Sequence, residues 1–200
     1  MLEHIISKLE QNRASFRIIQ HAPEGQSDRV CKIRGNTLHQ GAKAILLRLA
    51  VTKKISRYLL TVLPADMAVD FAEIARIFSV KNVMMAPVGK VKELTGCEVG
   101  AVPPFIFNPD IKIIVDNALV DDNVEIAFNA GRLDTSIIMR AEDYRRIIIA
   151  EGGQLLPFGV CQRTTALTPA FDVAKTSAEE GAPTDVSGET SKKEVTRPTI

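Results

Sequence analysis

The chain has 200 residues, 46% of them hydrophobic, and balances 25 Lys and Arg against 24 Asp and Glu for a formal net charge of +1. This length is enough for one domain with a sizeable hydrophobic core. The near-zero charge excludes an overall field that would attract a polyanion, so any contact with nucleic acid must come from a local patch.

The cysteines and the apolar runs exclude several other classes of protein. Cys31, Cys97 and Cys161 are widely spaced and form no C-x-x-C or Cys/His cluster. Neither a disulfide framework nor a zinc site is indicated, and we expect no metal and no cofactor. No run reaches the roughly 18 apolar residues of a membrane span. We therefore expect a soluble protein in a reducing, cytoplasmic compartment.

The first third of the chain predicts a helix followed by strands. Apolar residues at helical spacing predict a helix over residues 2–13, and residues 16–21 have the pattern of a strand. A polar segment, residues 22–36, follows with proline and glycine as turn formers. Two short apolar runs, residues 42–50 and 56–64, then predict neighbouring antiparallel strands, the second ended by its proline.

The rest of the domain mixes both kinds of element. Three segments have apolar residues at helical spacing and predict helices, and Asp66 or Asp70 could cap the first of the three. Short apolar runs between them predict strands. The predicted helices are 66–79, 87–96 and 141–152, and the predicted strands are 111–116, 124–131 and 136–140. Because these elements interleave too irregularly for a doubly wound sheet, we predict an α+β fold with a mixed, largely antiparallel sheet.

The composition changes near residue 165. Residues 165–200 are rich in Thr, Ser, Ala, Pro and Gly, and carry four Lys or Arg against six Asp or Glu. Such a segment cannot bury enough apolar area to offset the entropy of ordering it. We therefore predict a folded, mildly basic domain over residues 1–160 and a disordered tail over residues 165–200.

One lysine interrupts the apolar run of residues 41–49, GAKAILLRL. On a strand, Lys43 would share one face with Ile45 and Leu47, while alanine and leucine side chains lie on the other face. Two interpretations stay open. The methylenes can pack while the ammonium reaches solvent at the strand end, or the charge can hold a carbonyl or phosphate oxygen of a ligand at the mouth of a pocket.

Three other positions also allow both a structural and a functional interpretation. Residues 96–107 combine Gly100 with two prolines, which suits either a fixed loop whose N–H groups form an oxyanion cradle or an ordinary rigid connection. Residues 128–131, FNAG, end a strand and can be a plain hairpin turn or a pocket wall. Asp116 follows an apolar strand and can be a strand-end cap or a pocket residue.

Other common chemistry has little support in the sequence. His4, His21 and His39 show no metal-ligand spacing, and the chain contains no G-x-S-x-G, Walker or dinucleotide motif. A histidine-based nucleophile triad or a metal hydrolase is therefore disfavoured.

Several blocks, taken together and in order, resemble the YbaK/YeaK family, the free-standing relatives of the editing domain inserted in bacterial prolyl-tRNA synthetases. The resemblance covers roughly residues 1–155 and is nearest to the YeaK-like branch, through QGAKA, PPF and FNAG. The blocks are His21 at a strand end, RGNTLHQGAKAILLR (34–48), LPAD (63–66), TGCEVGAVPPF (95–105) and NAGRLDTSII (129–138).

The resemblance implies a barrel-like sheet flanked by helices and hydrolysis of the ester that joins a wrong amino acid to tRNA. Lys43 matches the family's lysine, Gly100 to Pro104 match its G-x-x-x-P loop, and Asn129 to Gly131 match the glycine loop on the opposite wall. The residues thereby implied are Lys43, Gly100 and Gly131 for catalysis, and His21, Pro104, Asp116, Asn129 and Ala130 for substrate binding.

The expected mechanism needs no protein nucleophile, because an aminoacyl ester is already activated. Lys43 would fix the terminal ribose, a phosphate or the ester carbonyl, while N–H groups near Gly100 and Gly131 take oxyanion charge. Water, or the ribose 2′-hydroxyl acting through it, would attack. Two departures from the family pattern, Pro103 in place of a small residue and the lack of a histidine after Gly131, affect amino-acid specificity rather than reaction class.

A small pocket excludes large side chains sterically, so alanine, serine or threonine on mismatched tRNA are the expected substrates. The expected partners are the acceptor end of aminoacyl-tRNA and an aminoacyl-tRNA synthetase, with no membrane, and a monomer or weak dimer. A non-catalytic binding module and a hydrolase of small free esters or amides stay as alternatives. Candidate tRNA contacts, equally readable as a solvated surface, are Lys32, Arg34, Lys53, Lys54 and Arg57.

Overall fold

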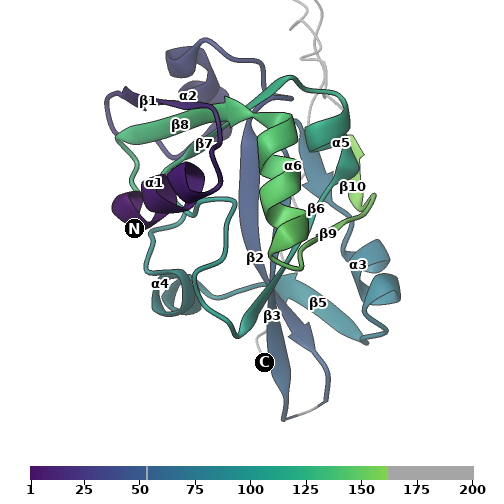
Figure 1. The fold of residues 1–200 in the computed structure, drawn as a ribbon. Coiled ribbons are helices and arrows are strands. Elements are labelled where there is room, and N and C mark those ends of the chain that lie inside the picture. The colour runs from purple at the N-terminus through teal and green to yellow at the C-terminus, as the bar shows by residue number, and fades with distance from the viewer. Residues whose placement is uncertain (53, 162–200) are drawn as a thin grey trace, which may run out of the picture. The chain divides into compact units, whose positions relative to one another are not determined.

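The computed structural model describes residues 1–52 and 54–161, and strands and helices are mixed along them (Figure 1). The helices are α1 (Leu2–Gln11), α2 (Ser27–Arg34), α3 (Phe71–Ile77), α4 (Val88–Thr95), α5 (Asn117–Asp121) and α6 (Ala141–Ala150). The strands are β1 (Phe16–Gln20), β2 (Ala42–Ala50), β3 (Ser56–Pro64), β4 (Met67–Val69), β5 (Asn82–Met85), β6 (Ile111–Val115), β7 (Glu125–Asn129), β8 (Thr135–Arg140), β9 (Gln154–Leu155) and β10 (Gly159–Cys161). The predicted tail, residues 165–200, lies outside the described residues.

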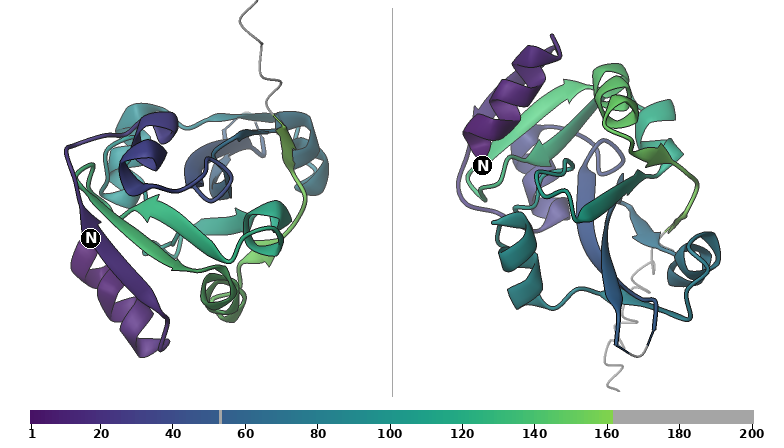
Figure 2. Two further views of the ribbon diagram at one scale, coloured as in Figure 1. Left: turned by 90° about the horizontal axis from the view of Figure 1, so that it is seen from above. Right: turned by 60° about the horizontal axis from the view of Figure 1, so that its bottom comes forward.

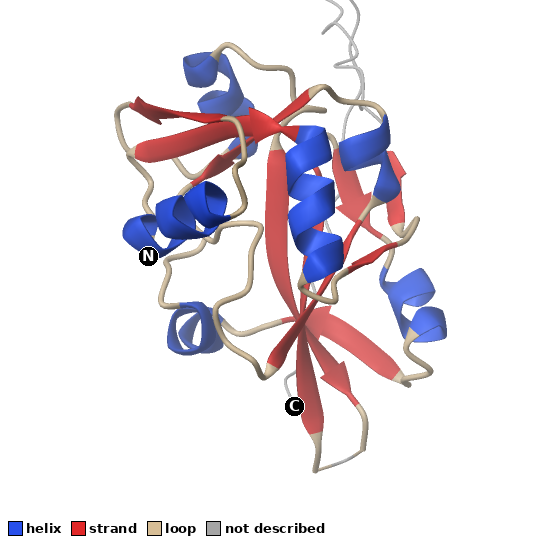
Figure 3. Ribbon diagram, in the orientation of Figure 1, coloured by secondary structure: helices blue, strands red, loops and turns tan. Residues whose placement is uncertain are grey.

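The strands form sheets that are mostly antiparallel. One sheet has the order β1-β8-β7, a second the order β5-β2-β3-β6-β9, and β4 pairs with β10 (Figure 3). Only the β3–β6 and β6–β9 pairs are parallel among the paired strands described. The two larger sheets are linked where Gly41 bridges Ala127. The predicted α+β fold with a mixed, largely antiparallel sheet is confirmed.

Strand β2 separates two hydrophobic clusters, as its alternating pattern predicts. Ala44 and Leu46 face a cluster shared with β7, β8 and α6, whereas Ile45 and Leu47 face a second cluster against α3 and β4. Lys43 is on the second of these faces, near the end of β2 where its partner is Leu63 of β3. The apolar surroundings predicted for Lys43 are therefore present on both faces.

The helices cover both sides of the β1-β8-β7 sheet. Figure 2 shows α1 and α6 together on one side and α2 on the other. Contacts tie α1 to α6, since Lys8 pairs with Glu151 at the end of α6 and Arg146 donates to the Asn12 carbonyl. Because α2 lies across β7 and β8 and next to the start of β2, these four elements can enclose a space between them.

Besides the short elements β5, α5, β9 and β10, for which the sequence analysis made no prediction, the structure differs from the sequence-based expectation at two places. Residues 22–36, expected as a polar loop, contain α2, and the expected helix over residues 66–79 is divided into β4 and α3. Helix α3 begins after Asp70, whose carboxylate accepts hydrogen bonds from the N–H groups of Ala72 and Glu73. The preceding residues instead pair with β10, a long-range contact that the local pattern does not contain.

Two further features concern what the described residues lack. No helix within residues 1–52 and 54–161 is long and apolar enough to cross a membrane. Across the same residues, no group of three or more His, Cys, Asp or Glu side chains is placed to hold a metal ion.

Candidate active site

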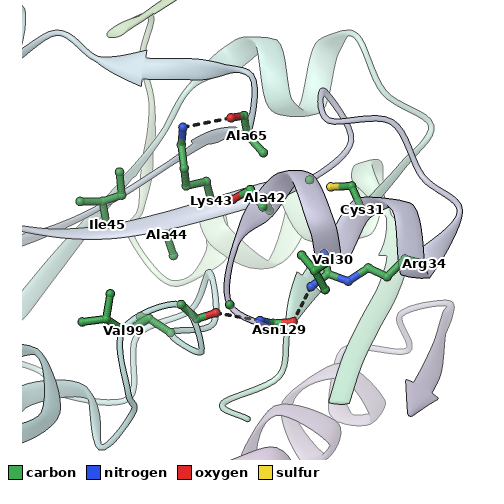
Figure 4. A pocket seen from close by; sticks show the side chains of 15 residues that line it. Val30, Cys31, Arg34, Ala42, Lys43, Ala44, Ile45, Ala65, Val99 and Asn129 are labelled. Atoms are coloured by element: carbon green, nitrogen blue, oxygen red, sulfur yellow. Dashed lines mark hydrogen bonds between the residues drawn. The ribbon is translucent and has the colours of Figure 1, made fainter. Parts of the chain in front are cut away.

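A cavity of about 210 Å³ opens between α2, the start of β2 and the loop that contains Gly100 (Figure 4). Its walls combine glycines and small apolar side chains with two cations. The lining residues are Gly25, Ser27, Val30, Cys31, Arg34, Gly41, Ala42, Lys43, Ala44, Ile45, Ala65, Val99, Gly100, Val102 and Asn129. The cavity therefore brings together Lys43, Gly100 and Asn129, three of the residues predicted for the site.

The ammonium of Lys43 is held by main-chain carbonyls. Its Nζ donates to the Ala65 carbonyl at 3.1 Å and also to the Met67 carbonyl, and Figure 4 shows the side chain reaching toward Ala65. Burial lowers the pKa of Lys43, and the nearby charge of Asp66 partly offsets this effect. Because an ammonium has three N–H donors, one remains for a ligand in the cavity.

Gly100 forms a close backbone contact on another wall. Its φ is +87°, and a Cβ at this position would lie 3.0 Å from the Cα and carbonyl oxygen of Gly25. Only glycine fits a left-handed conformation against another backbone at this distance. The Gly100 N–H has no acceptor among the hydrogen bonds of residues 1–52 and 54–161, so it is free to donate to a ligand.

Asn129, at the end of β7, forms hydrogen bonds to four residues around the cavity. Its side-chain N–H₂ donates to the Gly100 carbonyl at 2.8 Å and to the Glu24 carbonyl at 3.0 Å. Its Oδ1 accepts from Ser136 at 3.1 Å and from Arg34. With all of these bonds made, Asn129 sets the position of the walls and has no spare donor for a substrate.

Arg34 supplies the second cation of the cavity. Its guanidinium donates to the Ser136 hydroxyl at 2.8 Å and to Asn129, and it forms no ion pair with the carboxylates of the described chain. Burial lowers the pKa of Arg34 to about 10, which leaves it charged at neutral pH. His21 joins the same network from outside the cavity, with Nε2 2.6 Å from the Ser136 hydroxyl.

The lining offers positive charge and hydrogen-bond donors but no strong side-chain nucleophile. No Asp, Glu or His lines the cavity among the residues that the structure describes. Cys31 does line it, but burial raises the pKa of its thiol and so suppresses the reactive thiolate. The cavity is suited to bind an oxygen-rich or anionic group and to polarise a carbonyl.

Besides His21, four residues predicted for catalysis or substrate binding do not line the cavity. The Gly131 N–H donates to the Ala101 carbonyl at 3.0 Å, so the oxyanion role expected of it is corrected to shaping a turn at φ +78°. Ala130 is fully buried in the core. Pro104 is also buried, and its carbonyl accepts from Tyr144 at 2.9 Å.

Asp116 is the fourth, and the structure selects its role as a cap. Its Oδ1 accepts a hydrogen bond from the N–H of Ala118, so Asp116 caps the N-terminus of α5. Its Oδ2 accepts from the N–H groups of Phe158 and Gly159, at 2.8 and 2.6 Å. These bonds join the end of β6 to the start of β10, so the pocket role expected of Asp116 is corrected to a structural one.

The predicted tRNA contacts do not form one patch. Lys32 is exposed on α2 and Arg34 lines the cavity, whereas Lys54 and Arg57 are exposed at the far end of the β2–β3 hairpin, where Figure 1 shows the strands running away from α2. At about 3.3 Å per residue, Ala50 at that end is roughly 23 Å along β2 from Lys43. Lys53 lies outside the described residues.

Sequence reasoning missed the wall that α2 contributes. Val30 and Cys31 are buried in this helix and line the cavity, yet the surrounding residues are polar and show no strong helical pattern. The signal present was at the helix end, where Lys32 and Arg34 precede Gly35 in the left-handed conformation at φ +74°. Basic residues followed by glycine are typical of a helix C-terminus.

The fold and the cavity together define a domain of the class that edits aminoacyl-tRNA. Residues 21–147 match the family described as the aminoacyl-tRNA editing domain, and the chain belongs to this family. Relatives from Escherichia coli K12 and O157:H7, each called multifunctional Ser/Thr-tRNA deacylase ProXp-y, are 39% identical over 145 residues, which cover 72% of this chain and 86% of theirs. The predicted family and the predicted hydrolase class are thus confirmed.

Solved structures show the same fold at lower identity. A hypothetical protein of known crystal structure aligns with a TM-score of 0.68 and 19% identity over 78% of this chain and 99% of its own. A protein proposed to be a trans-editing enzyme for prolyl tRNA synthetase aligns with a TM-score of 0.63 and 16% identity over 80% and 96% of the two chains.

Proposed function

We propose that this chain hydrolyses, in trans, the ester of a mischarged aminoacyl-tRNA that carries a small amino acid of the size of Ala, Ser or Thr. The observation that carries the proposal is the pairing of Lys43 and the free Gly100 N–H in a cavity of about 210 Å³ without a carboxylate. The 39% identity to Ser/Thr-tRNA deacylases supports serine and threonine as the first substrates to test.

The proposed reaction uses water as nucleophile. Water adds to the ester carbonyl carbon, and the carbonyl oxygen becomes an oxyanion. The Gly100 N–H and the third N–H of Lys43 donate to oxygens of the reacting ester, where preorganised donors lower the barrier. Collapse of the intermediate breaks the bond to the ribose oxygen, which takes the proton that the water gave up, and releases the amino acid and the tRNA.

The second cation suits the tRNA end. Arg34 is held on Ser136 and Asn129 with a guanidinium nitrogen to spare, and a guanidinium binds phosphate well. We assign to it the last phosphate of the acceptor strand. Lys32, exposed on the same helix, would meet the adjoining backbone, and Lys54 and Arg57 would contact tRNA only if the acceptor stem follows the β2–β3 hairpin.

The proposed substrate also implies a compartment and a protein partner. The substrate is found in the cytoplasm, so we assign the activity to that compartment. A synthetase partner, which would deliver mischarged tRNA, and a monomeric or weakly dimeric state stay predictions, for which co-purification and light scattering are the direct measurements.

The test is a deacylation panel. Ser-, Thr- and Ala-tRNA would be compared with Leu- and Phe-tRNA, using the wild type, Lys43→Ala and the exposed-lysine control Lys112→Ala. We expect turnover of the small aminoacyl esters, a loss of about 100-fold or more in Lys43→Ala, and a wild-type rate in Lys112→Ala. Binding of aminoacyl-tRNA without turnover would instead indicate a binding module, and equal hydrolysis of simple amino-acid esters would indicate an esterase that ignores the tRNA body.

A further inference from the structure

His39 lies between two carboxylates next to the site, in the turn just before β2. Its Nδ1 is 3.1 and 3.0 Å from the two carboxylate oxygens of Asp66, and its Nε2 is 3.5 Å from Asp122 at the end of α5. The Asn123 side chain also donates to the His39 carbonyl at 3.2 Å. The imidazole is therefore held from both sides, most closely by Asp66.

Asp66 occupies the turn that holds Lys43. The two carbonyls that accept from the Lys43 ammonium belong to Ala65 and Met67, the residues on either side of Asp66. The same turn is joined to the His39 turn by the hydrogen bond from the Ala65 N–H to the Leu38 carbonyl, 3.2 Å long. The Asp66 carboxylate thus lies in the same turn as the two carbonyls that position the ammonium.

Two basic side chains lie near the Asp66 carboxylate. His39 contacts it directly, and Lys43 is close enough for the Asp66 charge to raise its pKa, against the larger effect of burial. On the other side of His39 the facing charge is Asp122, and the buried Cys31 thiol also feels Asp66. In the structure His39 contacts the carboxylate and the ammonium lies on the two carbonyls.

We propose that His39 is a positioning residue for Lys43. The protonated imidazole keeps the Asp66 carboxylate on its own side of the turn, which leaves the Lys43 ammonium on the carbonyls of Ala65 and Met67 with one donor for the substrate. When His39 loses its proton, its positive charge no longer attracts Asp66 and at most one neutral N–H remains as donor, so the carboxylate turns to the charged ammonium and Lys43 withdraws from the cavity. The catalytic consequence rests on the proposed function, whereas the coupling of His39 to Lys43 does not.

The direction of the pH effect follows from the charges. Burial opposes a charge on His39, but the hydrogen bond and attraction of Asp66, aided by Asp122, outweigh it and raise the pKa of His39 above 6.5. The favourable interaction is complete below the unfolded pKa of about 6.5 and is lost as the pH rises through the folded pKa. Positioning of Lys43 is therefore lost on the alkaline side.

The first experiment reads the coupling without catalysis. In protein labelled at the lysine side chains, the signal of Lys43, assigned by its absence from Lys43→Ala, is followed by NMR from pH 5 to 9. We expect a step in its chemical shift at the pH where the His39 ring titrates, and no such step in His39→Asn, which keeps a donor toward Asp66 but has no proton to lose. An unchanged profile in His39→Asn would overturn the proposal.

The second experiment uses rescue. At pH 7, His39→Ala should lower kcat for deacylation about 10- to 100-fold with little change in KM, and adding Asp66→Asn should restore it, because no carboxylate then competes for Lys43. Asp66→Asn alone should keep activity without the alkaline loss, and His4→Ala, an exposed control on α1, should behave as wild type. A double variant as inactive as His39→Ala would overturn the proposal. If the wild type deacylates nothing, the proposed function fails while the NMR titration still decides the coupling.

Discussion

The main chain of Gly100 packs directly against the main chain of Gly25. A methyl group on Gly100 would lie 3.0 Å from both the Cα and the carbonyl oxygen of Gly25, and Gly100 has a φ of +87°. Both residues line the cavity, and Asn129 fixes the same contact by donating to the carbonyls of Gly100 and Glu24. The width of the cavity is thus set by two backbones in contact.

Gly100→Ala should therefore lower the deacylation rate more than the strain of a left-handed alanine alone would. The added Cβ must separate the two loops, which displaces the Gly100 N–H, and a shift of about 1 Å at a reacting group can lower the rate about 100-fold. Gly96→Ala is the matched control, because Gly96 also has positive φ, +69°, but nothing within 4 Å of its Cβ position.

Deacylation rates and thermal unfolding of the two variants separate the effects. Both should lose about 1–2 kcal/mol of stability from the left-handed conformation, but only Gly100→Ala should lose most of its kcat. Equal activity in the two variants would contradict a role for this contact in catalysis.

Arg34→Gln should weaken tRNA binding and make it less dependent on salt. Glutamine can still donate to Asn129 or Ser136, so the walls stay joined while the charge is lost. If Arg34 neutralises one phosphate, the slope of log KM against log salt concentration should fall by about 0.7, the value per phosphate for a single strand. The control is Arg76→Gln on α3, an exposed arginine paired with Glu73; identical slopes for both variants would assign Arg34 to structure alone.

The extent to which sequence predicted the site depends on the range of the interactions. The period-two pattern of β2 correctly gave the two apolar faces around Lys43, because side-chain alternation is a local property. The blocks shared with the editing family located Gly100 and Asn129 for a different reason, namely their order along the chain. Neither source gave Arg34 its place inside the cavity, because that depends on how α2 lies across β7 and β8.

Hydrogen-bond partners were the least predictable part. Glycine at position 131 correctly indicated a turn, but the sequence does not say that its N–H is used by the Ala101 carbonyl. Asp116 left two interpretations, and only the arrival of Phe158 and Gly159, more than forty residues later, selected the cap. Such contacts arise from the fold as a whole rather than from any local pattern.

Asp116→Ala should destabilise the protein without changing the chemistry. The buried carboxylate accepts three main-chain N–H groups, and leaving these donors without a partner costs roughly 2–5 kcal/mol. Asp70→Ala, which removes the half-buried cap of α3, should cost only about 1 kcal/mol. Urea unfolding gives both values, and the rate per folded molecule at low temperature should equal that of the wild type in each case. Native stability with lost activity in Asp116→Ala would restore the pocket role that we have corrected.

Val30→Ala should widen the range of amino acids that the enzyme accepts. Val30 is 4% exposed and contributes its side chain from α2 to the cavity wall, so its truncation adds space where a substrate side chain would lie. A methylene-sized change in a pocket is worth about 1–3 kcal/mol of discrimination. We therefore expect kcat/KM for Val- or Leu-tRNA to rise about tenfold or more, while the rates on Ser- and Thr-tRNA change little.

The control is Val91→Ala in α4, a core valine that is 8% exposed and does not line the cavity, because it makes a similar void elsewhere. If the two variants kept the same substrate profile as the wild type, the limit on side-chain size would lie outside the α2 wall.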